Sequence, residues 1–120
     1  MTRLPGWWIA LGLLASTAAG CGAIEYSVYI LQAHEAIAEA EVAGAGPAME
    51  GDECGPEQEG VSCWLAPYEY TYALEHLRKA REEVGQADYQ AAVEMARAAR
   101  DFARKARDMA AQLRREAGRD

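Results

Sequence analysis

The sequence predicts an all-α protein, a three-helix antiparallel bundle preceded by an N-terminal export signal. In three separate segments, apolar residues recur at alternating spacings of three and four residues, which is typical of helices that pack on one face. Glycine and proline lie between these segments and mark their ends. We expect helices at about 23–43, 67–84 and 88–117, a long loop at 44–65, and a single domain over 21–120.

Residues 1–20 have the composition of an export signal. Arg3 supplies a positive charge, residues 7–15 are apolar, and residues 18–20 are small. The apolar run is shorter than the roughly 20 residues that a membrane-spanning helix needs. We therefore expect this segment to be cleaved and to take no part in the mature fold.

Cys21 follows the signal directly. The stretch "LLASTAAGCGAIEY", residues 13–26, resembles the lipobox of bacterial lipoproteins, although Ala18 stands where leucine is usual. The resemblance implies a diacylglycerol thioether on Cys21, which cleavage makes the new N-terminus, and two or three acyl chains hold a protein on a membrane stably. The alternative is a plain secretory signal that leaves Cys21 as a free thiol. By the same resemblance, Gly22 in place of aspartate indicates the outer membrane of a Gram-negative bacterium, with the domain facing the periplasm.

The charge distribution argues against a nucleic-acid partner. Residues 21–120 contain 11 basic and 19 acidic side chains, giving a formal charge of −8. All 11 basic residues lie in 78–120, whereas residues 21–77 contain 11 acidic residues and no lysine or arginine. The chain is therefore expected to be acidic in its first half and mixed in its second.

The first helix is expected to have two apolar faces. One contains Tyr26, Ile30, Ala33, Ile37 and Ala40, and the other contains Ile24, Val28, Leu31 and Ala38. A polar stripe of Glu25, Gln32 and Glu39 lies between them. This pattern predicts a helix sandwiched between neighbours, which ends at Gly44, Gly46 and Pro47.

The acidic loop at 44–65 contains the other two cysteines, Cys54 and Cys63. Export makes a disulfide possible, and Gly55 and Pro56 between the cysteines favour a turn. We expect a bridge that closes a short loop and stabilises the protein by about 2 to 3 kcal/mol. The carboxylates of the loop lack the ligand spacing of a calcium site, so no metal is expected.

The second helix is expected to begin at Pro67, which suits a first-turn position, and to be capped by Gly85. Asp88 is expected to cap the third helix after a tight turn. The predicted buried side of the second helix comprises Tyr70, Ala73, Leu74, Leu77, Ala80 and Val84. The third helix has the seam Ala92, Met95, Ala99, Phe102, Ala106, Met109 and Leu113, flanked by Ala96, Ala103 and Ala110. Small residues alternating with large ones predict close helix packing.

The stretch "APYEYTYALEHLRKAREEVGQADYQAAVEMARAARDFARKARDMA" is similar to an alanine-rich bacterial lipoprotein family known as domain of unknown function 4398. The resemblance covers about 65–110 and implies a lipidated helical hairpin, with a short turn before Tyr89. The hairpin also resembles a single tetratricopeptide unit, with Tyr89, Ala92 and Ala99 at matching spacings. The family supplies no catalytic residues or cofactor.

The sequence contains no recognisable motif of a known class of enzyme. "HEAIA" at His34 lacks the second histidine of a zinc protease, and His76 stands alone. No catalytic pair, phosphate loop or cofactor fingerprint is present. We therefore expect a non-enzymatic protein.

The candidate partner-binding residues are Trp64, Tyr68 and Tyr72. Both tyrosines fall opposite the predicted core side of the second helix, and amphipathic rings are favoured at interfaces. Alternatively, the first helix or the loop covers them, with Tyr26 and Tyr29 as packing partners. The expected function is a helical interaction or scaffold module of the envelope, with a protein partner or a second copy of the chain. The alternative is a module that binds cell-wall peptidoglycan or a small ligand through these aromatic rings.

Overall fold

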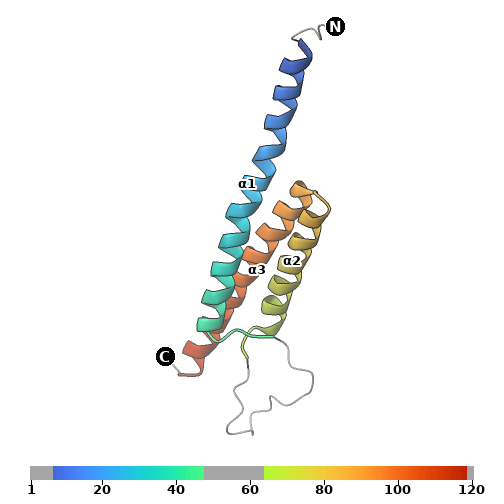
Figure 1. Ribbon diagram of the computed structural model, residues 1–120. Helices are drawn as coiled ribbons and strands as arrows, with labels where there is room; N and C mark the ends of the chain where they lie inside the picture. Colours follow the sequence, from blue (N-terminus) through green and yellow to red (C-terminus); the bar gives the residue numbers. More distant parts are fainter. Residues whose placement is uncertain (1–6, 48–63, 119–120) are drawn as a thin grey trace.

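The computed structural model describes residues 7–47 and 64–118. The described residues form three helices, α1 (Trp7–Val42), α2 (Pro67–Gly85) and α3 (Tyr89–Glu116). Figure 1 shows α2 antiparallel to both of the other helices, so that α1 and α3 run in the same direction. The predicted all-helical bundle is confirmed.

The local signals at the ends of α2 and α3 explain where these helices begin. Pro67 occupies the first turn of α2, where its missing N–H costs no hydrogen bond. Asp88 caps α3, because its Oδ1 accepts the N–H of Ala91 at 3.0 Å. The expectation that Gly85 caps α2 is wrong. Gly85 is the last residue of the helix, and the left-handed conformation that ends the turn falls on Ala87, with φ 60°.

α1 is longer than the helix expected at about 23–43. It begins at Trp7 and passes through the leucine- and alanine-rich stretch predicted to be the export signal, whose residues favour helix. Its end matches the expectation closely, because Gly44 takes a φ of 95° that favours glycine. The N–H of Ala45 then donates to the carbonyl of Ala40 at 2.9 Å and closes the last turn.

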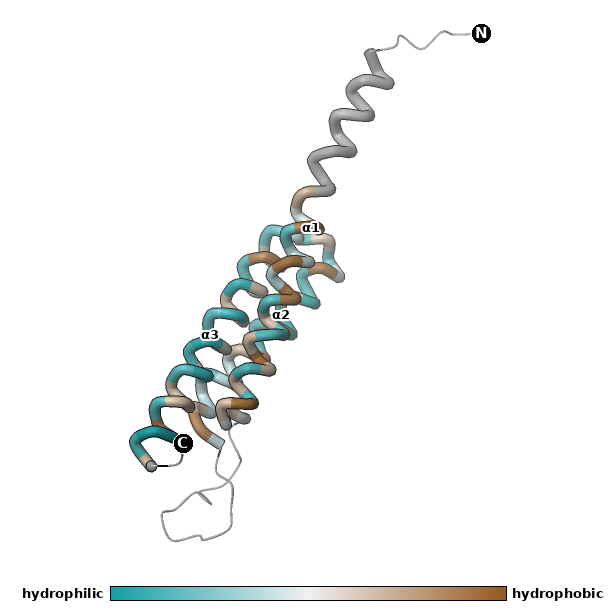
Figure 2. The backbone as a smooth tube through the Cα atoms, turned by 90° about the vertical axis from the view of Figure 1, so that its left-hand side faces the viewer, coloured by the Kyte–Doolittle hydropathy of each residue, from teal (hydrophilic) through white to brown (hydrophobic). Residues whose placement is uncertain are grey.

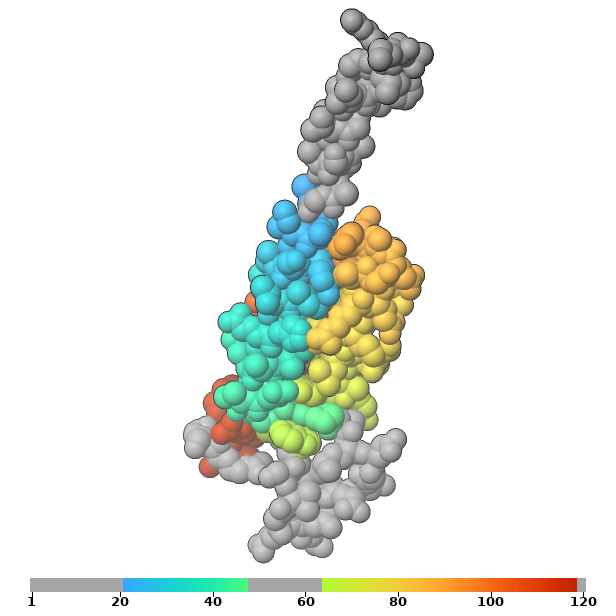
Figure 3. Space-filling view, viewed as in Figure 1, coloured from blue at the N-terminus to red at the C-terminus, as the bar shows by residue number. Residues whose placement is uncertain are grey.

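The core is built mainly from alanine. α3 lies behind α1 and α2 in Figures 1 and 3, and both pack against it. The α3 residues that are fully buried are all alanines at alternating spacings of four and three, namely Ala92, Ala96, Ala99, Ala103, Ala106 and Ala110. Because these side chains are small, neighbouring backbones approach closely. The polar residues of α3 lie outside this stripe, and Figure 2 shows how they dominate the helix.

The larger residues of the predicted α3 seam lie at its edges. Phe102 and Met109 are only partly buried against the core, and Leu113 is exposed. α2 contributes Tyr70, Ala73, Leu77 and Ala80 as predicted, whereas Leu74 is exposed and Val84 is half-buried. The close approach of the backbones at the alanines explains why the larger side chains of the α3 seam lie at its edges.

The prediction that α1 is sandwiched on two sides is wrong. Its inner face is buried, with Ala33, Ile37 and Ala40 in the core. Its second apolar face, which includes Ile24 and Leu31, is exposed. The physical reason is that α3 packs on one side of α1 and α2 packs mainly on α3, so the described residues provide no neighbour for the outer side.

A row of polar contacts fixes α1 against α3. The polar stripe of α1 faces arginines of α3, in the pairs Glu25–Arg97, Gln32–Arg100 (3.1 Å) and Glu39–Arg107 (2.6 Å). Arg97 and Arg100 also lie over the ring of Tyr29, 4.4 and 5.1 Å from its centroid. Each exposed pair contributes at most about 1 kcal/mol. The last two pairs are seven residues apart on both helices, as expected for two parallel helices in fixed register.

The two ends of the predicted loop at 44–65 lie side by side. The N–H of Leu65 donates to the carbonyl of Gly44 at 2.9 Å, and the N–H of Gly46 donates to the carbonyl of Leu65 at 3.3 Å. Backbone contacts therefore hold the chain together at the base of the loop. Cys54 and Cys63 lie outside the described residues, so the bridge between them stays a prediction.

Candidate functional site

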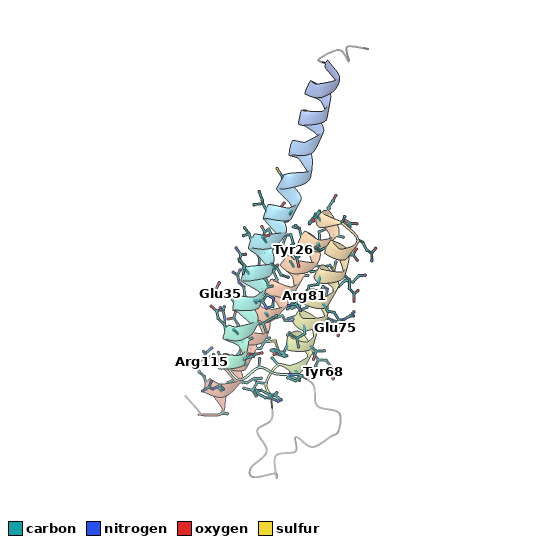
Figure 4. All side chains as sticks on the ribbon, in the orientation of Figure 1. Tyr26, Glu35, Tyr68, Glu75, Arg81 and Arg115 are labelled. Carbon is teal, nitrogen blue, oxygen red and sulfur yellow. The ribbon has the colours of Figure 1, made fainter. Side chains whose placement is uncertain are left out.

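The predicted partner-binding residues gather at the end of the bundle where α2 begins. Trp64, Tyr68 and Tyr72 are 45%, 73% and 54% exposed, and we call these three residues the aromatic surface. Figure 4 shows Tyr68 at the base of α2, beside the connection to α1. Of the two alternatives, a cover by α1 does not hold for the described residues. A cover by the loop involves residues 48–63, which lie outside the described part of the chain. Three large rings therefore face outward within one short segment.

Tyr72 is held in place by rings from both helices of the hairpin. It stacks on Phe102 of α3, with ring centroids 5.5 Å apart. His76 lies 5.2 Å from the same phenylalanine ring, and its Nδ1 is 2.8 Å from the carbonyl oxygen of Tyr72. Stacked aromatic pairs contribute about 0.5–1.5 kcal/mol. Tyr72 therefore forms the fixed side of the aromatic surface, while Tyr68 is its most exposed member.

Trp64 is positioned by a glycine. Gly46 is buried, and a Cβ atom on it would come closer than 3.0 Å to the indole of Trp64. The ring therefore lies directly on the Gly46 backbone. Leu65, the next residue, makes the backbone contacts that close the base of the loop. This arrangement fixes the indole beside the start of α2.

Polar contacts on the inner side of α2 support the aromatic surface. The hydroxyl of Tyr70 donates to Glu41 of α1, and burial, with a further contribution from Glu41, raises the pKa of Tyr70 to about 12. Lys105 of α3 lies 3.0 Å from Glu69, and this hydrogen bond is the main cause of the lowered pKa of Glu69. The first turn of α2 is thus tied to both other helices.

The predicted lipidation residue lies at the opposite end of the bundle. Cys21 is exposed. At Gly22 a Cβ atom would lie 2.9 Å from the Cβ of Tyr89, so α1 approaches the start of α3 closely there. Since α1 rises by about 1.5 Å per residue, Cys21 is about 30 Å from Val42, near the aromatic surface. The two predicted sites therefore do not meet.

Sequence reasoning missed His76 and Phe102 as neighbours of the aromatic surface. The spacing of four residues between Tyr72 and His76 was a usable signal, because such side chains meet on one helix face. Phe102 had no comparable signal, since its contact with Tyr72 depends on the register of α2 against α3.

The described residues of the aromatic surface offer exposed contact area. In residues 7–47 and 64–118, no three metal-ligating side chains come together. His34 and His76 lie on different helices, and Nε2 of His34 is 2.9 Å from an Arg81 nitrogen.

None of the described helices combines the length and apolar character needed to cross a membrane. No match was found for this chain among protein-family models, curated proteins or solved structures.

Proposed function

We propose that this chain is a lipoprotein of the outer membrane that faces the periplasm and binds an envelope protein through its aromatic surface. The observation that supports this most is the separation of the two sites. Cys21 and the aromatic surface lie at opposite ends of a narrow bundle, about 30 Å apart along α1. A lipid on Cys21 would hold one end at the membrane and direct the aromatic surface away from it.

The anchoring step is tested by replacing the lipidated sulfur. Cys21→Ser should give unprocessed or soluble protein in a Gram-negative host, because serine cannot form the thioether. Membrane fractionation and intact mass would measure this. Outer-membrane protein of the same mature mass from the variant and the unmodified chain would contradict the proposal.

The partner-binding step is tested by photo-crosslinking from a single position. A crosslinking residue at Tyr68 should capture an envelope protein, whereas one at Glu82 should not. Glu82 serves as the control because it is also exposed on α2 but lies near the other end of this helix. Equal capture from the two positions, or none from Tyr68, would refute binding at the aromatic surface.

A second candidate is peptidoglycan binding through the same rings. Tyr72 and Phe102 form a stacked pair beside the exposed Tyr68, which would offer a sugar or peptide a flat apolar face. Sedimentation of the protein with purified peptidoglycan would favour this candidate. In either case the α2–α3 hairpin would act as a single tetratricopeptide-like unit with a binding role and not a catalytic one.

The proposed Cys54–Cys63 bridge would strengthen the loop that precedes Trp64. Its closure would add to the backbone contacts of Gly44, Gly46 and Leu65 at the base of the loop. Alkylation followed by mass spectrometry should find neither thiol free in the oxidised protein. Two alkylated residues would show that the bridge is absent.

A further inference from the structure

The outer face of α1 is an exposed apolar feature of the described residues that the proposed function does not use. Ile24, Val28, Leu31 and Val42 are 69%, 48%, 68% and 82% exposed. They lie on one side of the helix, away from α2 and α3. In Figure 4, Glu35 on the same side points away from the other two helices. Exposed groups of apolar residues on one face often mark an interaction surface.

The residues of this face follow a heptad repeat. The outer α1 stripe, as we call it, consists of Cys21, Ile24, Val28, Leu31, Glu35, Ala38 and Val42, at alternating spacings of three and four. β-Branched Val28 and Val42 occupy one of the two heptad positions, while Ile24 and Leu31 occupy the other. Val28 and Val42 in the first set and Leu31 in the second match the pattern of parallel two-stranded coiled coils, whereas Ile24 does not. The stripe therefore suits a second helix with the same repeat.

The residues at the edges of the stripe contact basic side chains. Glu25 and Glu39, which flank it on the α3 side, are paired with arginines of α3. On the α2 side, His34 contacts Arg81. A second acidic chain could therefore approach this face without meeting a row of unpaired carboxylates. Glu35, within the stripe, is the exception, since the described residues offer it no ion-pair partner.

We propose that the outer α1 stripe packs against the same stripe of a second copy of this chain, with the two helices parallel and in register. The orientation rests on the proposed lipidation. Cys21 is the first residue of the stripe, so two anchored copies would leave the membrane side by side and in the same direction. The stripe spans only three heptads, about 30 Å, and tethering in one leaflet raises the effective concentration that so short an interface needs.

Glu35 is the weak point of this pairing. In a parallel dimer the two Glu35 side chains face each other across the seam, and like charges at such a position oppose association. Replacing Glu35 by leucine should therefore strengthen the dimer, while replacing Leu31 by glutamate should abolish it. Both residues are exposed in the single bundle, so neither change is expected to unfold it.

Disulfide crosslinking in membranes tests the proposal on the complete chain. Cys54 and Cys63 are first replaced by serine, and one cysteine is placed at Leu31 or, as a control, at the exposed Leu74 of α2. Mild oxidation should give a dimer several times faster from Leu31→Cys than from Leu74→Cys. Adding Glu35→Leu should increase this dimer further. Equal rates at the two positions, or a crosslinked product with the mass of a different protein, would overturn the proposal.

The orientation and the anchoring have separate readouts. Co-expressed Ile24→Cys and Val42→Cys chains should not crosslink to each other, because these positions lie at opposite ends of a parallel seam. A strong mixed crosslink would show an antiparallel pair and would overturn the proposed arrangement. Fractionation of the same cells reports anchoring independently. Membrane-bound protein without the Leu31→Cys dimer refutes the dimer alone, and soluble protein without it refutes both proposals.

Discussion

The contact between Gly46 and Trp64 predicts opposite effects for one substitution made at two glycines. Gly46→Ala should destabilise the protein, because the new methyl group would come closer than 3.0 Å to the indole and the ring must move. Gly85→Ala should have the opposite effect, since nothing lies within 4 Å of its Cβ position. Neither glycine has a positive φ, so backbone strain does not contribute.

The size of the effect follows from the burial of Trp64. The residue is 45% exposed, so a little over half of its surface is covered in the folded state. An aromatic side chain buries about 150–250 Å², and each Å² is worth about 25 cal/mol, so complete loss of this covered part would cost about 2.5 kcal/mol. A partial rotation would cost less, so we expect about 1 to 2.5 kcal/mol for Gly46→Ala. Gly85→Ala should gain about 0.5 kcal/mol from helix propensity.

Urea denaturation followed by circular dichroism would measure both free energies of unfolding. In a chain that begins at Gly22, Trp64 is the only tryptophan, so its fluorescence reports the ring directly. Gly46→Ala should shift the emission to longer wavelength, whereas Gly85→Ala should leave it unchanged. Unchanged stability and emission in Gly46→Ala would refute the close contact.

Three further substitutions test the caps and the core. Asp88→Ala should lower the free energy of unfolding by about 1 kcal/mol through loss of the α3 cap, as urea denaturation would show; no loss would contradict the capping role. Ala99→Leu should cost about 1–3 kcal/mol by overpacking, as a thermal melt would show against the exposed control Ala117→Leu, and equal melting temperatures would contradict the close packing. The raised pKa of Tyr70, about 12 against an ordinary 10.0, means that its neutral form contributes stability that is fully present below pH 10 and is lost as the pH rises toward 12. One pKa unit corresponds to about 1.4 kcal/mol. Between pH 9 and pH 12, the free energy of unfolding should therefore fall by about 2 kcal/mol more for the unmodified chain than for Tyr70→Phe. An equal fall in both proteins would exclude this role for the Tyr70–Glu41 contact.

The local features of the fold could be predicted because they depend on neighbouring residues. Pro67 and Asp88 act within one helical turn, and the sequence places them at the starts of α2 and α3. The end of α2 was harder to predict. Glycine at position 85 suggests a helix cap there, but the residue with the left-handed conformation is Ala87. Backbone hydrogen bonds around Ala87 stabilise this conformation.

The packing of α1 could not be predicted because both of its apolar faces have helical spacing. Which face is buried depends on where α2 and α3 place their alanines, and this is a property of the assembled bundle. The same limit applies to the candidate site. The helical wheel of α2 correctly places Tyr68 and Tyr72 away from the core, but the contact between Tyr72 and Phe102 requires the register of two helices.

The alanine stripe of α3 has a consequence for how the protein responds to temperature. Alanine loses no side-chain rotamer freedom when it is buried, so the core assembles with little conformational cost from its side chains. It also covers little apolar area per residue, and the heat capacity of unfolding grows with that area. The heat capacity change should therefore fall below the usual value of about 12–15 cal/mol/K per residue. Such a protein has a flat stability curve, and its free energy of unfolding changes little between cold and warm surroundings.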